Sequence, residues 1–170
     1  MITECLVQKR PFGMVRAKDN ALASIGCAAT ILNVIKKYED GRMDIAATGA
    51  QRFEITKLNQ ERSFLQGEVT YFDDVPSSVG PSDVATVIEL HEQLFDTLGQ
   101  TVDVEHDADL LSFHLAHELP VDLDFKQALL EMKSEAERIE MLTEYYRATI
   151  PKIEKTLQAR ERASGNGHVH

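Results

Sequence analysis

The sequence predicts an α+β protein, with antiparallel strands in its first half and helices in its second half. Before residue 73 apolar residues tend to recur at every second position, as they do along half-buried strands, whereas after residue 83 they recur at three- and four-residue steps, as on helices. A turn-rich segment, residues 73–82, separates the two patterns. We therefore expect a β-rich subdomain over residues 1–75, a helical subdomain over residues 76–162, and a disordered tail over residues 163–170.

The first half begins with a short helical pattern over residues 1–10, which Pro11 would end. Residues 12–17 fit a short strand. Residues 25–37 are rich in Ile, Val and Ala and fit a longer strand.

An Asp40-Gly41 pair follows the longer strand and predicts a hairpin with a primed turn, because such a turn needs positive φ at its central residues. Apolar and polar residues then alternate over residues 43–47 and again over residues 51–58. In residues 65–71, Leu, Gly, Val and Tyr would face one way and the residues between them the other. These runs predict an antiparallel meander.

The second half predicts three helices. The first covers residues 84–98 and ends at Gly99, and the second runs from Asp107, as its N-cap, to Leu119. The third is long, with Asp124 as its cap, and carries an apolar stripe. The stripe consists of Leu129, Met132, Ala136, Ile139, Leu142, Tyr146, Ile150, Ile153 and Leu157.

The net charge of −10 is unevenly distributed. Residues 1–75 carry ten basic and ten acidic side chains, whereas residues 76–170 carry eight basic and eighteen acidic ones. No Lys or Arg lies between Arg62 and Lys126, so the chain lacks the basic surface that nucleic-acid binding needs. Two isolated cysteines and the absence of an apolar run of membrane-spanning length favour a cytoplasmic protein that does not enter a membrane.

The sequence contains no recognisable catalytic motif. Its glycines form no phosphate-binding loop, no GxSxG element is present, and neither His-Glu pair is followed by the second histidine of a zinc-binding HExxH helix. We therefore predict no catalytic residue, no metal site and no cofactor. His114 and His117 lie one helical turn apart, so a small metal-dependent enzyme that uses both histidines is the alternative.

Three stretches in the first half resemble the N-terminal domain of the Lon family of ATP-dependent proteases. They are residues 25–31, residues 38–45 with the Asp-Gly hairpin, and residues 49–55. Two further stretches, residues 107–119 and residues 126–139, resemble helices of the same domain in the same order. The residues that carry this signature most clearly are Gly26, Asp40, Gly41, Gly49, Arg52, Phe53, Lys126, Gln127 and Glu131.

The resemblance implies a PUA-like pseudobarrel followed by a helical bundle, and a role in recognising proteins. It therefore implies a non-enzymatic module that binds unfolded or flexible protein segments, as an adaptor or regulator with a protease as partner. An RNA-binding PUA-like module is the alternative that the missing basic face argues against. Gly49 is expected where the backbone is tight, Arg52 in an ion pair and Phe53 in the core.

Two features differ from the family pattern. An apolar segment that usually precedes the first helix is absent, so we expect Met1 to be an internal start, with an exposed sheet edge through which two copies of the chain could pair. Phe113 and Phe125 stand where the family is often polar. They are candidate anchors for a client protein, although Phe125 lies four residues before Leu129 and both rings could simply pack.

Overall fold

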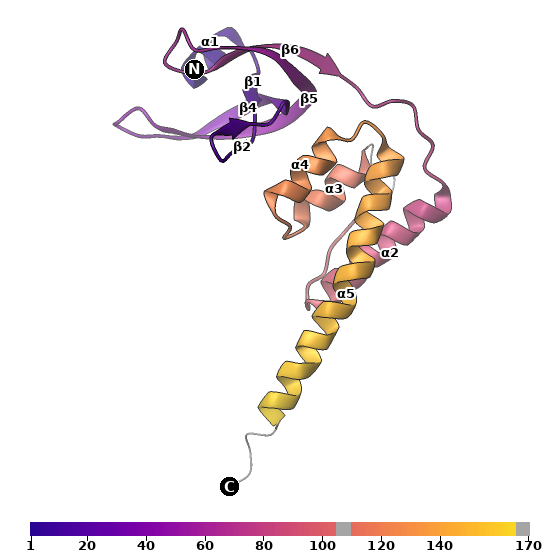
Figure 1. Ribbon diagram of the computed structural model, residues 1–170. Helices are drawn as coiled ribbons and strands as arrows, with labels where there is room; N and C mark the ends of the chain where they lie inside the picture. The colour runs from indigo at the N-terminus through magenta and orange to yellow at the C-terminus, as the bar shows by residue number, and fades with distance from the viewer. Residues whose placement is uncertain (105–109, 166–170) are drawn as a thin grey trace. The chain divides into compact units, whose positions relative to one another are not determined.

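The computed structural model describes residues 1–104 and 110–165 and divides into two compact units, Met1–Asp73 and Asp74–His170 (Figure 1). Among the described residues, the first unit contains six strands and one short helix, and the second contains four helices. The α+β fold predicted from the sequence is thereby confirmed. None of the described helices is both long enough and apolar enough to cross a membrane.

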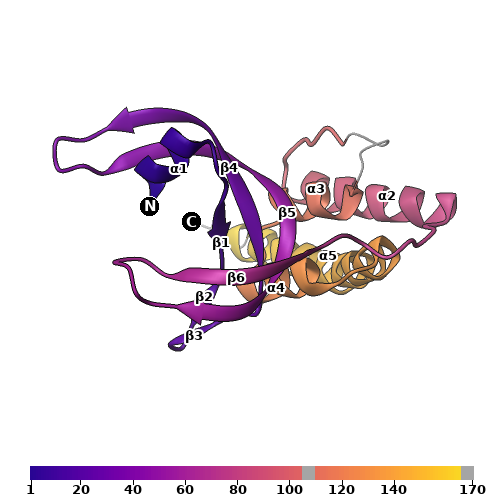
Figure 2. The ribbon, with the colours of Figure 1, turned by 90° about the horizontal axis from the view of Figure 1, so that it is seen from above.

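The first unit is built on an antiparallel sheet with the strand order β1-β4-β5-β6, and a separate two-stranded ladder joins β2 to β3. Figure 2 shows the long β4–β5 hairpin projecting beyond the other strands of this unit. The elements of the unit are α1 (Ile2–Gln8), β1 (Phe12–Met14), β2 (Ala17–Lys18), β3 (Ala21–Leu22), β4 (Ile25–Lys37), β5 (Met43–Asn59) and β6 (Gln66–Phe72).

The β4–β5 hairpin is present, but its primed turn was predicted wrongly. The Tyr38 N–H donates to the Arg42 carbonyl over 2.9 Å and the Gly41 N–H donates to the Tyr38 carbonyl over 3.0 Å, which leaves a three-residue loop. Within this loop, Gly41 is the residue with a positive φ, which is 87°. This is the loop class in which a turn is followed by one left-handed residue, so Asp40 needs no positive φ. Its carboxylate instead accepts the Arg42 N–H over 3.1 Å.

A two-residue turn with positive φ at both positions occurs elsewhere in the unit. Asp19 and Asn20 have φ values of 50° and 64° and connect β2 to β3, which pair through Lys18 and Ala21. Asp and Asn tolerate this conformation better than other residues with a Cβ. The sequence pattern missed this turn because the two strands are too short to show an alternation.

The interior of the sheet is organised around Phe53, which is 3% exposed and pairs with Gly26 across β4 and β5. A Cβ at Gly26 would lie 2.5 Å from the Met14 carbonyl oxygen and 2.8 Å from Phe53 Cζ. One at Gly13 would lie 3.0 Å from Phe53 Cζ. The phenyl ring therefore occupies space that two glycines on neighbouring strands leave open.

The second unit contains the main hydrophobic core of the chain. Its helices are α2 (Pro81–Thr97), α3 (Leu111–Glu118), α4 (Leu123–Glu131) and α5 (Glu135–Gly165). Gly99, with a φ of 71°, follows α2 as predicted. Buried members of the predicted stripe that belong to this core are Leu129, Ile139, Leu142, Tyr146 and Ile150.

The long third helix was predicted wrongly, because it is two helices. Helix α4 ends at Glu131, and the Ser134 hydroxyl accepts a hydrogen bond from the Glu137 N–H at the start of α5. The cap of α4 is Asp122, whose carboxylate accepts the Phe125 N–H over 2.8 Å, and not Asp124. The predicted N-cap at Asp107 lies outside the described residues.

The break between α4 and α5 is held by Arg138, whose side chain is fully buried. Its guanidinium pairs with the carboxylates of Asp74 and Glu135 and donates over 2.9 Å to the Met132 carbonyl. Glu135 also accepts the N–H and hydroxyl of Ser112 from α3. Because Asp74 lies in the segment predicted as a loop between subdomains, one buried cation fixes that segment to the helices of its own unit.

The close packing of Phe53 against Gly26 gives a first prediction. Gly26→Ala should lower the free energy of unfolding by about 3 kcal/mol, because the new methyl group meets backbone as well as the Phe53 ring. At Gly49 a Cβ would lie 3.5 Å from Cys27 Sγ, an ordinary contact. Gly49→Ala is therefore the matched control and should change stability by less than about 0.5 kcal/mol in chemical denaturation. Equal losses in the two variants would contradict the role of Gly26.

The buried cation gives a second prediction. Arg138→Met should lower the free energy of unfolding of the helical unit by about 3–5 kcal/mol. The side chains of Asp74 and Glu135 are each only 18% exposed, and the substitution removes the cation that pairs with both carboxylates. Far-ultraviolet circular dichroism during urea denaturation measures this loss. Arg147→Met, at an exposed position on the same helix, should cost less than about 0.5 kcal/mol. A loss of similar size at Arg147 would show that charge on α5, and not this network, is responsible.

Candidate functional site

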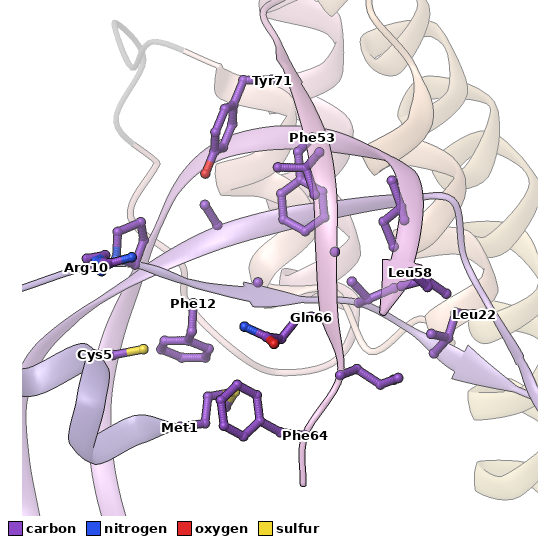
Figure 3. Close-up of a pocket in the computed structure, with 18 residues that line it drawn as sticks. Met1, Cys5, Arg10, Phe12, Leu22, Phe53, Leu58, Phe64, Gln66 and Tyr71 are labelled. Atoms are coloured by element: carbon purple, nitrogen blue, oxygen red, sulfur yellow. The ribbon is translucent and has the colours of Figure 1, made fainter. Parts of the chain in front are cut away.

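The first unit carries an apolar groove with a cavity volume of about 560 Å³ (Figure 3). Helix α1, strands β1, β5 and β6, and the loop that precedes β6 all contribute side chains to its lining. Its aromatic members are Phe12, Phe53, Phe64 and Tyr71. Its larger aliphatic members are Met1, Val15, Leu22, Ile55, Leu58, Leu65 and Val69.

The alternation along β6 is what places its side chains in the groove. Leu65, Gly67, Val69 and Tyr71, which the sequence pattern puts on one face, all line it. On β5, Phe53 and Ile55 do the same at a two-residue spacing. Successive side chains of a strand point to opposite faces of the sheet, so this apolar alternation forms a continuous surface across two neighbouring strands.

Most of this apolar lining is open to solvent. Tyr71 and Leu65 are each 48% exposed, and Leu58 is 45% exposed. Of the lining residues only Ala28 and Phe53 are buried. The buried cluster that forms the main core lies wholly in the helical unit. An open apolar surface of this kind marks an interaction site more often than a structural surface.

Helix α1 forms one wall of the groove through Met1 and Cys5. Two charge-assisted hydrogen bonds hold it, because Arg62 donates to the carboxylate of Glu4 over 2.7 and 3.0 Å. The same guanidinium lies 4.7 Å from the centre of the Phe64 ring, and Figure 3 shows this ring next to Met1. Both ends of the ion pair are nearly half exposed, so it contributes less than about 1 kcal/mol.

The predicted anchors Phe113 and Phe125 do not lie in this groove. They belong to α3 and α4 and pack against the core of the helical unit. The Arg138 guanidinium lies 4.4 Å from the Phe113 ring centre, and the ring centres of Phe125 and Tyr145 are 5.1 Å apart. Both rings are therefore engaged inside their own unit, and a client-binding role for them stays a prediction.

The signature residues of the first unit lie in the sheet and its hairpin. Gly26 and Phe53 meet in the sheet interior, and Phe53 also lines the groove. The Arg52 guanidinium lies 4.9 Å from the Phe72 ring centre on the adjacent strand. Gly41 provides the positive φ of the hairpin loop. No steric reason for a glycine exists at Gly49, where a methyl group fits.

The signature residues of the second unit support its helix ends. Lys126 donates over 3.3 Å to the carbonyl of His117 in the last turn of α3, where a cation is favourable. Gln127 donates to the carboxylate of Glu131 one turn further along α4, over 2.8 Å. These contacts link α3 to α4 and lie on the surface of α4, and a structural role for the three residues stays a prediction.

His114 and His117 are both exposed, and the described residues contain no group of three metal-binding side chains. The histidine with an unusual environment is His91, which is 0% exposed. Its Nδ1 lies 2.7 Å from the Tyr146 hydroxyl, and its Nε2 lies 3.5 Å from a Glu118 carboxylate oxygen. The sequence did signal its burial, because His91 falls on the apolar stripe of residues 84–98.

The chain is therefore a protein of the α+β class whose β-sheet unit carries an open apolar groove. The family model described as the ATP-dependent protease La (LON) substrate-binding domain matches residues 1–147. The chain therefore belongs to this family, as the sequence predicted.

Two solved structures confirm the fold. A Lon N-terminal domain protein from Xanthomonas campestris matches with a TM-score of 0.64 and 21% identity, over 83% of this chain and 79% of that one. The N-terminal domain of a Mycobacterium avium complex Lon protease matches with a TM-score of 0.54 and 20% identity, over 79% of this chain and 77% of that one.

Two Lon proteases are similar in sequence. That of Buchnera aphidicola subsp. Baizongia pistaciae (strain Bp) is 22% identical over 170 residues, which cover 92% of this chain. That of Amoebophilus asiaticus (strain 5a2) is 28% identical over 134 residues, which cover 72% of it. The matches span only 21% and 16% of the length of these relatives.

His91 gives a third prediction. Burial lowers the pKa of its imidazole below the ordinary value, although Glu118 and Glu92 act to raise it. The unfolded chain then binds a proton more readily than the folded one, so stability is lost as the pH falls below about 6.5, the pKa of an unperturbed histidine. His91→Gln removes the titrating group and keeps an acceptor for the Tyr146 hydroxyl.

The measurement is the free energy of unfolding of both proteins at several values from about pH 7.5 to about pH 5.5. Carboxylates titrate in both proteins, so their contribution cancels in the difference between the two slopes. We expect the wild-type protein to lose stability more steeply than the variant on acidification. Parallel slopes would show that His91 does not couple folding to pH.

Proposed function

We propose that this chain is a non-catalytic recognition module that binds extended, apolar segments of unfolded or flexible proteins in the groove of its β-sheet unit. The observation that supports the proposal is an apolar surface, contributed by two adjacent strands and exposed to solvent. The family to which the chain belongs is described as the substrate-binding domain of an ATP-dependent protease. Unfolded polypeptides present the apolar side chains that such a groove can cover.

The expected affinity is modest. Each apolar side chain that a client buries in the groove contributes about 1.5–3 kcal/mol. The client loses conformational entropy when its segment becomes ordered, which offsets much of this gain. We therefore expect reversible binding, with a preference for apolar segments over polar ones.

The proposal extends to a role as adaptor or regulator of proteolysis, in which a protease is the second partner. The two similar sequences are Lon proteases, and this chain corresponds to about a fifth of their length or less. Their proteolytic activity is not transferred to it. A cytoplasmic location and self-association through a sheet edge also stay predictions from the sequence.

RNA is a poor ligand for the same groove. Of the described residues that line it, Arg10 is the one with a charged side chain. Single-stranded nucleic acids are bound by aromatic rings together with several cations that follow the phosphates, and this lining has the rings without the cations. The geometry therefore favours a polypeptide.

The proposal predicts a fourth result. In a fluorescence-anisotropy titration of a labelled, permanently unfolded protein, we expect saturable binding that unlabelled client reverses. Leu65→Asp, which introduces a charge at a half-exposed position in the groove, should weaken binding about tenfold or more. Thermal unfolding of each variant shows whether its fold is intact.

Leu32→Asp is the matched control, because Leu32 is 66% exposed in the same unit and does not line the groove. It should leave the affinity unchanged. Equal weakening by both substitutions would indicate nonspecific contact with apolar surface, and an absence of binding by the wild-type protein would refute the proposal.

A further inference from the structure

Strand β6 borders the groove and is an edge strand. It pairs antiparallel with β5 from Arg52↔Phe72 to Asn59↔Gln66, and no other described strand pairs with it. Its residues Gly67, Val69 and Tyr71 line the groove. One strand therefore combines an apolar surface on its face with a backbone edge that another strand can join.

The orientation of the β6 backbone can be followed from a single contact. The carbonyl of Glu68 accepts a hydrogen bond from the Thr56 hydroxyl of β5 over 3.0 Å, so the backbone N–H and carbonyl groups of Glu68 point toward β5. Backbone polar groups alternate in direction along a strand. Gly67 and Val69 on either side of Glu68 consequently direct their N–H and carbonyl groups toward the open edge.

The other long unpaired edge, on β4 beyond Ala29, is poorly suited to strand addition. The register with β5 shifts between Ile31 and Asn33 and again between Val34 and Lys36. Each shift marks a bulge, which interrupts the ladder and bends the strand. Lys36 and Lys37 follow, and lysines of this kind commonly protect an edge from pairing. Strand β6 itself contains no bulge in its pairing with β5, since the extra residue at the one register shift lies on β5. Its outward N–H and carbonyl groups therefore form a regular edge.

We propose that the client binds by β-strand addition to the open edge of β6, with apolar side chains at alternate positions in the groove and a carboxylate near Arg10. This inference rests on the proposed function and specifies how the same groove selects its ligand. Alternation follows from strand geometry, since every second side chain of an added strand faces the same side. The acidic preference follows from charge complementarity with Arg10, which is exposed.

The backbone part of the proposal can be tested with two isomeric peptides. The parent peptide alternates valine and threonine, ends in an aspartate, carries a fluorophore and exceeds the seven residues of β6. One isomer is N-methylated at every valine and the other at every threonine. Because the N–H groups of alternate residues point to opposite edges of a strand, each isomer can donate hydrogen bonds from one edge only. Strand addition predicts that one isomer keeps the affinity of the parent while the other binds about tenfold more weakly or worse, since several hydrogen bonds are lost.

The charge part is tested by replacing the terminal aspartate of the peptide with lysine. Arg10→Glu should weaken binding of the aspartate peptide several-fold and strengthen binding of the lysine peptide, because the sign of the interaction is reversed. Arg42→Glu is the control, since Arg42 is exposed in the hairpin loop and does not line the groove. It should change neither affinity.

The outcomes separate this inference from the proposed function. If unfolded protein binds, but the two methylated isomers bind equally and Arg10→Glu has no effect, the groove is a recognition site without strand addition. If neither the unfolded protein nor any peptide binds, the proposed function fails as well. Light scattering that shows a dimer in the wild-type protein but not in Leu65→Asp would assign the groove to a second copy of the chain and overturn the inference.

Discussion

The β-sheet unit depends on the packing of one phenyl ring against two glycines. Phe53 on β5 fills the space above Gly13 on β1 and Gly26 on β4, and its ring meets Tyr71 of β6 edge-on at 6.2 Å. All four strands of the sheet therefore contribute to a contact centred on one side chain. Because Phe53 is also part of the groove lining, the residue that orders the sheet is the same residue that forms the floor on which a ligand would lie. The structural and the proposed binding roles of this position cannot be separated by removing its ring.

The helical unit uses a different principle. Its core is apolar, but the arrangement of the segments around the α4–α5 break depends on the buried Arg138. The guanidinium of this residue contacts the carboxylates of Asp74 and Glu135 and the Met132 carbonyl. A buried ion pair brings little net stability, because desolvation offsets most of the attraction. It does require one arrangement of its partners, since any other leaves a charge unpaired in the interior. This requirement explains why the chain turns sharply between α4 and α5 where the apolar stripe alone would allow one continuous helix.

Local patterns in the sequence predicted the four strands of the main sheet and most of the helices, but not the short β2 and β3, and the exceptions have physical causes. The stripe from Leu129 to Leu157 continues across the break after Glu131, so periodicity could not reveal the turn that Arg138 imposes. The hairpin at Asp40-Gly41 was located correctly, but its turn class depends on the pairing of Tyr38 with Arg42, which no dipeptide encodes. The groove could be predicted from the sequence only in part. The alternation in residues 65–71 was visible, whereas the contribution of α1 depends on contacts between segments distant in sequence, such as Glu4 with Arg62.

The distribution of charge fits recognition of unfolded chains better than recognition of one folded partner. The unit that carries the groove, Met1–Asp73, has ten basic and nine acidic side chains, so it neither attracts nor repels a client strongly at long range. The acidic excess lies in the second half of the chain. Pairing through the backbone is available to almost any extended sequence, since only proline lacks the N–H group. In the proposed mode of binding, selectivity would come from the few side chains that enter the apolar groove and from one cation, Arg10. Such a site would tolerate many clients and would still distinguish an apolar segment from the polar surface of a folded protein.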